Sequence, residues 1–130
     1  MLVQRVVELV EATSFPGLDR AQILAALVAV LGAAGLVSIR DFPLGGRHRL
    51  ALLVAEPLPW GRSAVGVELA WPGDSDALLG RLSRDAEHPA VDALVVVGTT
   101  TGQRWVPRQV AGVPVHPATI RLAPDVTMPG

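Results

Sequence analysis

The chain has 130 residues, 50% of them apolar, and its formal net charge at pH 7 is −1. A chain of this length can enclose one hydrophobic core, and its near-neutral charge excludes a global basic field for non-specific nucleic-acid binding. All 11 basic residues are arginines and cysteine is absent, which excludes disulfides, thiol chemistry and a lysine acting as base or Schiff-base partner. Any contact with nucleic acid therefore requires a local cluster of arginines.

The N-terminal segment, residues 2 to 12, predicts a short amphipathic helix. Its apolar residues recur at helical spacing, with charged residues on the opposite face. Glu8 and Glu11 interrupt the apolar run that a secretory signal requires, so we expect no signal peptide. We therefore expect a cytoplasmic protein, or a virion protein if a phage encodes it. The apolar helix positions are Leu2, Val3, Val6, Val7 and Val10.

An uncharged stretch, residues 21 to 39, allows two interpretations. Its length approaches the roughly 20 apolar residues that span a bilayer. Asp19 is a good N-cap, however, and Gly32 and Gly35 are typical of a helix C-terminus, so the stretch favours a helix that ends near Ala34 and is followed by a strand. We expect this helix to be buried, or to offer its apolar surface to a protein partner, and we expect no contact with a membrane.

The rest of the chain alternates strands with one helix. A hairpin turn is expected over 41–46, strands over 47–55 and 63–71, a helix to about Glu87, and a central strand over 92–98. One or two edge strands are expected over 113–122, because Pro114 and Pro117 interrupt that segment. In the helix we expect Leu78, Leu79, Leu82 and Ala86 to face inward, and Arg81 and Asp85 to form a solvated pair.

These elements predict one α/β domain over residues 1–122 and a C-terminal tail over 123–130. The expected core is a mixed sheet of four to five strands flanked by helices, in the order αβββαβ after an N-terminal extra helix. The three histidines have no metal-ligand spacing, so we expect no metal site built on them.

Glu68 is the one charged residue inside the strand over 63–71. A buried carboxylate is costly unless it is paired or coordinated, so Glu68 is the first candidate for a functional residue. The two-residue period of a strand places Ala64, Gly66 and Ala70 on the same face as Glu68.

The segment over 18–122 resembles the PD-(D/E)XK superfamily, the restriction-endonuclease-like nucleases, through its order of elements and the strand residues Val67, Glu68, Leu69 and Ala70. The resemblance implies a magnesium site built from an aspartate on the second core strand and an E-x-K on the third. Ala51 stands where the aspartate is expected, and Ala70 stands where the lysine is expected. The resemblance therefore implies a degenerate member with Glu68 as the remaining catalytic residue, and magnesium as cofactor only if the chain is still a nuclease.

Two interpretations of Glu68 remain open. It can pair with Arg49 on the neighbouring strand, which would satisfy the carboxylate without any chemistry. Alternatively, a migrated acid and a migrated cation, Arg49 or Arg62, can restore a metal site. The candidate acids are Asp41, Glu56, Asp74, Glu8 and Glu11.

Four residues are candidates for contact with nucleic acid or with a protein partner: Arg47, Arg49, Trp60 and Arg62. We expect a non-catalytic interaction or assembly module in a larger bacterial or phage complex, with a protein partner or a homo-oligomer. A nucleic-acid-binding or residual nuclease domain is the first alternative. A small phage head–tail or tail-completion protein is the second.

Overall fold

The computed structural model of the chain describes residues 2–15, 19–56, 64–70, 75–98 and 106–122. The described residues form three helices, α1 (Leu2–Glu11), α2 (Arg20–Ala33) and α3 (Ser75–Glu87). The longer strands are β2 (Val37–Gly45), β3 (His48–Ala55), β4 (Ala64–Leu69), β5 (Ala93–Gly98) and β7 (Val113–Thr119). Three two-residue strands complete the set, β1 (Ser14–Phe15), β6 (Gln109–Val110) and β8 (Arg121–Leu122).

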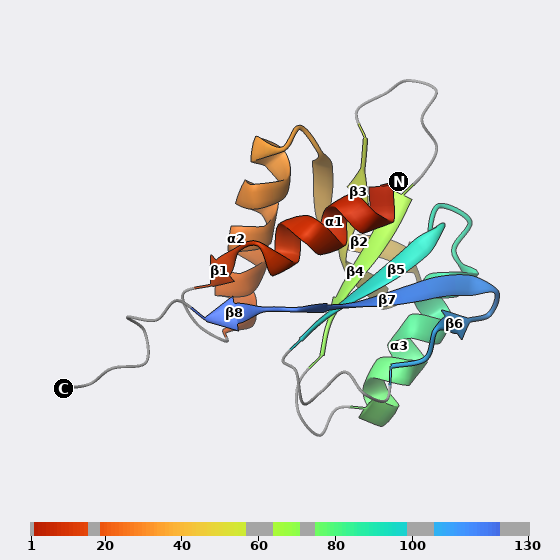
Figure 1. The fold of residues 1–130 in the computed structure, drawn as a ribbon. Coiled ribbons are helices and arrows are strands. Elements are labelled where there is room, and N and C mark those ends of the chain that lie inside the picture. The colour runs from red at the N-terminus through yellow and green to blue at the C-terminus, as the bar shows by residue number, and fades with distance from the viewer. Residues whose placement is uncertain (1, 16–18, 57–63, 71–74, 99–105, 123–130) are drawn as a thin grey trace.

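The main sheet has six strands in the order β2-β3-β4-β5-β7-β6 (Figure 1). The strands β2, β3 and β4 are antiparallel neighbours, whereas β4, β5 and β7 are parallel. The short strands β1 and β8 pair separately, in parallel. The predicted single α/β domain with a mixed sheet is confirmed, but the predicted strand count of four to five is too low and the order lacked β1 and β6.

The strand β7 is continuous from Val113 to Thr119, although it contains two prolines. The Val115 N–H donates to the Arg108 carbonyl oxygen at 2.9 Å, on the side of β7 that faces away from β5. Because backbone N–H groups alternate along a strand, the nitrogen of Pro117 faces the same side. The missing N–H of Pro117 therefore costs no bond to β5, and the predicted interruption of this strand is wrong.

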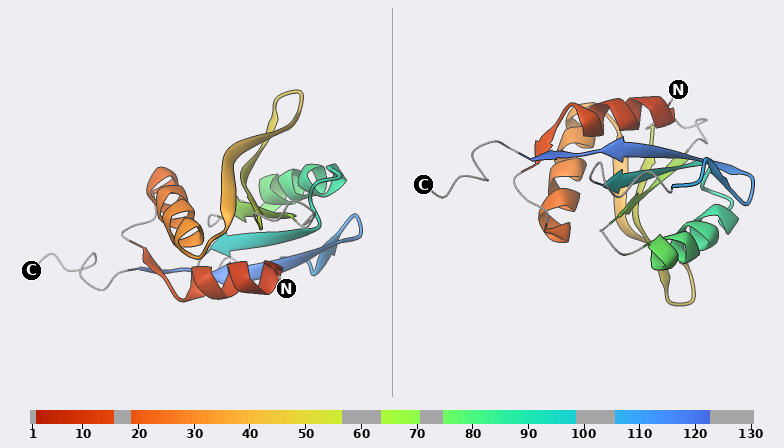
Figure 2. Two further views of the ribbon diagram at one scale, coloured as in Figure 1. Left: turned by 90° about the horizontal axis from the view of Figure 1, so that it is seen from above. Right: turned by 60° about the horizontal axis from the view of Figure 1, so that its bottom comes forward.

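Helices cover both faces of the sheet, with α1 and α2 on one face and α3 on the other (Figure 2). The strands β4 and β5 are buried along their whole length, because both of their faces are covered. The prediction of a central strand over 92–98 is confirmed. The core on the α1 and α2 face includes Val6, Leu24, Leu27, Val67 and Val95, and the core on the α3 face includes Leu50, Leu78, Leu82, Leu94 and Val96.

The helix α2 begins and ends where the sequence predicts. The Asp19 side chain accepts a hydrogen bond from the Gln22 N–H at 3.2 Å, and Gly35 adopts a left-handed φ of 83° beyond the last turn. Leu24 and Leu27 lie on its buried face. Among the described residues, no helix is both long enough and apolar enough to cross a bilayer.

Three local predictions are wrong. The strand β2 continues to Gly45, through Asp41 with its positive φ of 50°, so the hairpin turn lies at Gly46 and Arg47 rather than over 41–46. Leu79 is 38% exposed rather than facing inward. Asp85 is 1% exposed rather than solvated, because α3 turns it toward the sheet.

Candidate functional site

Glu68 lies on β4 and points to the α3 face of the sheet. Its neighbours on the strand divide as the two-residue period requires, since Ala64 and Ala70 join the core under α3 while Val67 and Leu69 join the opposite core. Glu68 is only 3% exposed. The predicted facing of this strand is confirmed.

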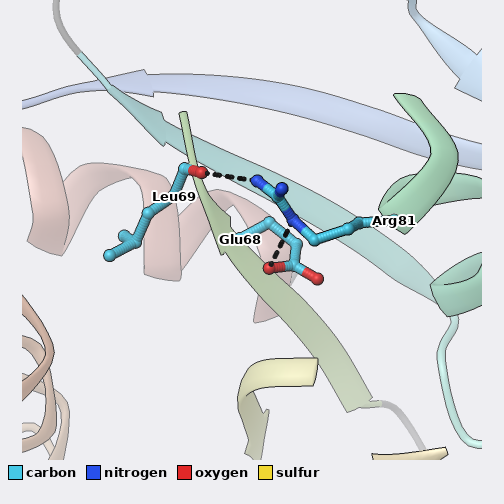
Figure 3. A network of polar contacts seen from close by, with 3 residues as sticks. All are labelled: Glu68, Leu69 and Arg81. Atoms are coloured by element: carbon cyan, nitrogen blue, oxygen red, sulfur yellow. Dashed lines mark hydrogen bonds and ion pairs between the residues drawn. The ribbon is translucent and has the colours of Figure 1, made fainter. Parts of the chain in front are cut away.

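The guanidinium group of Arg81, on α3, lies beside the Glu68 carboxyl group. The Arg81 Nε atom lies 3.8 Å from Glu68 Oε1, and Arg81 Nη2 donates to the Leu69 carbonyl oxygen at 3.2 Å (Figure 3). The predicted pairing of Glu68 with Arg49 is wrong. Arg49 donates instead to the Asp41 carbonyl oxygen at 3.3 Å.

The register of the sheet explains why Arg49 does not pair with Glu68. The pairing of β3 with β4 starts at Leu52, opposite Val67, and runs away from Arg49 toward Ala55. Arg49 therefore lies outside the paired segment, near the hairpin turn. Arg81 lies on α3, which packs over this face of the sheet, and its side chain reaches Glu68 from the helix.

A second carboxyl group, Asp85 of α3, contacts Glu68. Burial, followed by a hydrogen bond and charge repulsion from Asp85, raises the pKa of Glu68 to about 9, while Arg81 and Arg20 oppose the shift. Burial also raises the pKa of Asp85, against the opposing effects of Glu68, Arg81, Arg84 and His48. Glu68 is thus the protonated member of the pair near neutral pH.

The raised pKa values of the two carboxyl groups point to a proton shared between them. Glu68 Oε2 and Asp85 Oδ2 are both buried, and neither oxygen has a hydrogen-bond partner of regular geometry among the described residues. Two ionised carboxylates cannot hydrogen-bond to each other, whereas a carboxylic acid can donate to a carboxylate. We conclude that Glu68 donates to Asp85.

Asp85 was missed in the sequence because it lies one turn after Arg81, a spacing typical of exposed ion pairs. The helical period of the apolar residues, in contrast, places Asp85 on the buried face of the helix. Leu78, Leu82 and Asp85 recur at intervals of four and three residues, and both leucines are fully buried. The three residues therefore share the buried face of α3.

Four of the acids proposed as migrated ligands lie in the described part of the chain, and none of them is seen to join this pair. Glu11 accepts from the Thr119 N–H at 3.1 Å, and Glu8 lines a surface pocket with His116. Asp41 and Glu56 are not among the groups that shift the pKa of Glu68, and Asp74 lies outside the described residues. Within the described part of the chain, no three His, Asp or Glu side chains are grouped so that they could hold a metal ion.

Ala51 and Ala70 are both 3% exposed, but they lie on different faces of the sheet. Ala51 packs in the core under α1 and α2, and Ala70 packs in the core under α3 with Leu78 and Leu82. An aspartate at position 51 would therefore not face Glu68. The arrangement of three groups that the resemblance implies does not form here.

A pocket of about 300 Å³ lies between the β2–β3 hairpin and α3, and Asp85 of the carboxyl pair is part of its lining. It contains four of the chain's 11 arginines, together with His48, Leu44 and Asp85, and we call it the arginine pocket. Its arginines are Arg47, Arg49, Arg81 and Arg84.

The predicted contact residues Arg47 and Arg49 thus lie in one pocket, and the arginines of α3 were missed as members of it. The remaining candidates, Trp60 and Arg62, lie outside the described residues. A near-neutral chain that places four arginines around one pocket has the local positive field that binding an anion requires.

Comparison with known proteins gives no relative. No protein-family model, no curated protein and no solved structure matches the chain.

Proposed function

We propose that the chain is a nucleic-acid-binding domain of nuclease-like architecture that holds the phosphate backbone in the arginine pocket and does not cleave it. The presence of four arginines in the lining of one pocket carries the proposal. Guanidinium groups bind phosphate oxygens through paired N–H donors, and they keep their charge at every physiological pH. The protein would act in the cytoplasm, or in a virion if a phage encodes it.

The order of elements supports the nuclease-like architecture. From α2 onward the chain runs through three antiparallel strands, then α3, then β5 in parallel with β4. This is the αβββαβ order of the resemblance. The cation beside Glu68 comes from Arg81 rather than from position 70.

The carboxyl pair supports binding rather than cleavage. A nuclease of this kind needs ionised carboxylates that hold magnesium and activate water. Glu68 instead keeps its proton near neutral pH, donates it to Asp85 and lies beside Arg81. A phosphate group held by arginines needs none of that chemistry.

The direct test is fluorescence anisotropy with a labelled oligonucleotide at low salt. Removing two arginines in Arg47→Ala/Arg84→Ala should weaken binding at least about tenfold, because each charge-assisted hydrogen bond contributes about 1.5–3 kcal/mol. Arg40→Ala is the matched control, since Arg40 is also exposed but pairs across the sheet with Leu52 of the opposite core. Equal affinity of the double variant and the wild type would refute the proposal.

Cleavage is tested separately by incubating the same oligonucleotide with the protein and Mg²⁺. We expect no cleavage by the wild type. Magnesium-dependent cleavage that disappears in Glu68→Gln would show a residual nuclease and contradict the binding-only function.

A protein-interaction module is a second candidate, because the edge strand β2 exposes two large apolar side chains. Val37 and Ile39 are each 48% exposed and lie two residues apart on the same strand face. A homo-oligomer or a protein partner would cover them. Light scattering after size exclusion should then show an assembly that Ile39→Lys disrupts. Leu79→Lys, on the exposed surface of α3, is the control and should leave the assembly intact. A wild-type monomer that captures no partner would count against this candidate.

A further inference from the structure

The arginine pocket continues into a second pocket along α3. The second pocket has a volume of about 550 Å³ and shares Leu44, His48 and Arg84 with the first. Its other lining residues are Glu87, His88 and Pro89, at the end of the helix. The two pockets therefore form one groove between the β2–β3 hairpin and the C-terminal half of α3.

The two ends of this groove differ in chemistry. One end has four arginines, whereas the other has one of those arginines, a carboxylate at Glu87, and the apolar surfaces of Leu44 and Pro89. The carboxylate at the second end repels phosphate and can accept a hydrogen bond from an amino group. A ligand that fits both ends has an anionic part and a flat, uncharged part.

His88 gives the second pocket a fixed aromatic ring. Its Nδ1 atom accepts from the Ala90 N–H at 3.1 Å, and Phe42 packs edge-on against the ring with 5.4 Å between centroids and 82° between planes. These two contacts hold the imidazole in one orientation before any ligand arrives. A preorganised ring of this kind suits stacking on a nucleobase.

We propose that the second pocket takes the base of the nucleotide whose phosphate lies in the arginine pocket, so that the groove binds single-stranded nucleic acid. The inference rests on the proposed function, because the phosphate must occupy the first pocket. In a duplex each base is stacked and paired, and extruding one costs a few kcal/mol. A single strand offers its bases without that cost.

The test compares three labelled 12-mers of equal length by fluorescence anisotropy: a single strand, the same strand in a duplex, and a single strand with abasic sites. We expect the single strand to bind about tenfold more tightly than either of the others, because stacking of one base contributes about 1–3 kcal/mol. His88→Ala should reduce the affinity for the base-bearing strand to that for the abasic strand. His88→Phe should retain the preference, and thermal unfolding checks that both variants are folded.

The outcomes separate this inference from the function on which it rests. If the base-bearing and abasic strands bind equally, and Arg47→Ala/Arg84→Ala still weakens both, the phosphate site stands and the base pocket is refuted. Tighter binding of the duplex also refutes the base pocket. If no oligonucleotide binds at low salt, both proposals fail together.

Discussion

The two faces of the sheet are built from the same strands but differ in what they bury. Among the described residues, the buried side chains under α1 and α2 are all apolar, including Val67 and Leu69 of β4. Under α3, the same strand contributes Ala64, Gly66 and Glu68, and the helix adds Asp85. The α3 face thus buries two carboxyl groups and opens into the arginine pocket.

The difference leads us to expect separate roles for the two faces in stability and in binding. A face packed only with apolar side chains contributes hydrophobic stabilisation and little else. A face that buries a carboxyl pair loses part of that stabilisation, and such sites persist in functional regions more often than elsewhere. We expect substitutions on the first face to change folding, and substitutions on the second face to change pH dependence and binding.

The largest effect is expected on the apolar face. Leu27→Ala removes a side chain that is 1% exposed and leaves a cavity, so it should lower the free energy of unfolding by about 2–5 kcal/mol. Chemical denaturation measures the loss. Leu79→Ala on α3, where the side chain is 38% exposed, is the matched control and should cost under about 1 kcal/mol.

A pH-dependent effect on stability is expected from Glu68, on the other face of the sheet. In the folded chain Glu68 holds its proton up to a pKa of about 9, whereas in the unfolded chain it ionises near 4.5. Between these values the folded state binds more protons than the unfolded state, so stability falls as the pH rises from about 4.5 to about 9 and then levels off.

Glu68→Gln keeps the donor to Asp85 and removes this titration. At pH 9 the variant should be more stable than the wild type by at least about 2 kcal/mol, since one pKa unit corresponds to about 1.4 kcal/mol. Denaturation curves at pH 6 and pH 9 give the comparison. A wild type whose stability rises over this range would show that the carboxyl pair does not share a proton.

The smallest effect is expected on binding. Loss of the shared proton adds one negative charge to a carboxyl pair whose Asp85 lines the arginine pocket, so affinity for an oligonucleotide should fall roughly three- to tenfold as the pH rises from 7.5 to 9.5. In Glu68→Gln the affinity should stay constant over the same range. Parallel pH dependence in the wild type and the variant would exclude the pair as the cause.

Most of the fold could be predicted from the sequence, because local patterns determine it. The cap at Asp19, the glycine after α2, and the apolar run of β5 each have one dominant explanation. The continuity of β7 could not be predicted, because a proline fits within a strand only where its nitrogen faces away from the neighbouring strand that needs a hydrogen bond. That direction depends on which strand lies beside it.

The site was harder to predict, because its partners come from different elements. Glu68 was found by its charge in an apolar strand, and Arg47 and Arg49 by their clustering. The contact of Glu68 with Arg81 and Asp85 depends on how α3 crosses β4, which no local pattern encodes. The spacing of Asp85 after Arg81 predicted a solvated ion pair, whereas Asp85 is buried.

The salt dependence of oligonucleotide binding tests the central claim most directly. A phosphate backbone held by arginines should give a linear fall of log affinity with log salt concentration, and Arg47→Ala/Arg84→Ala should reduce that slope by about 1 to 1.5. Arg40→Ala should leave the slope unchanged. A slope near zero in the wild type, or one that the double variant does not alter, would contradict the assignment of the arginine pocket as a phosphate site.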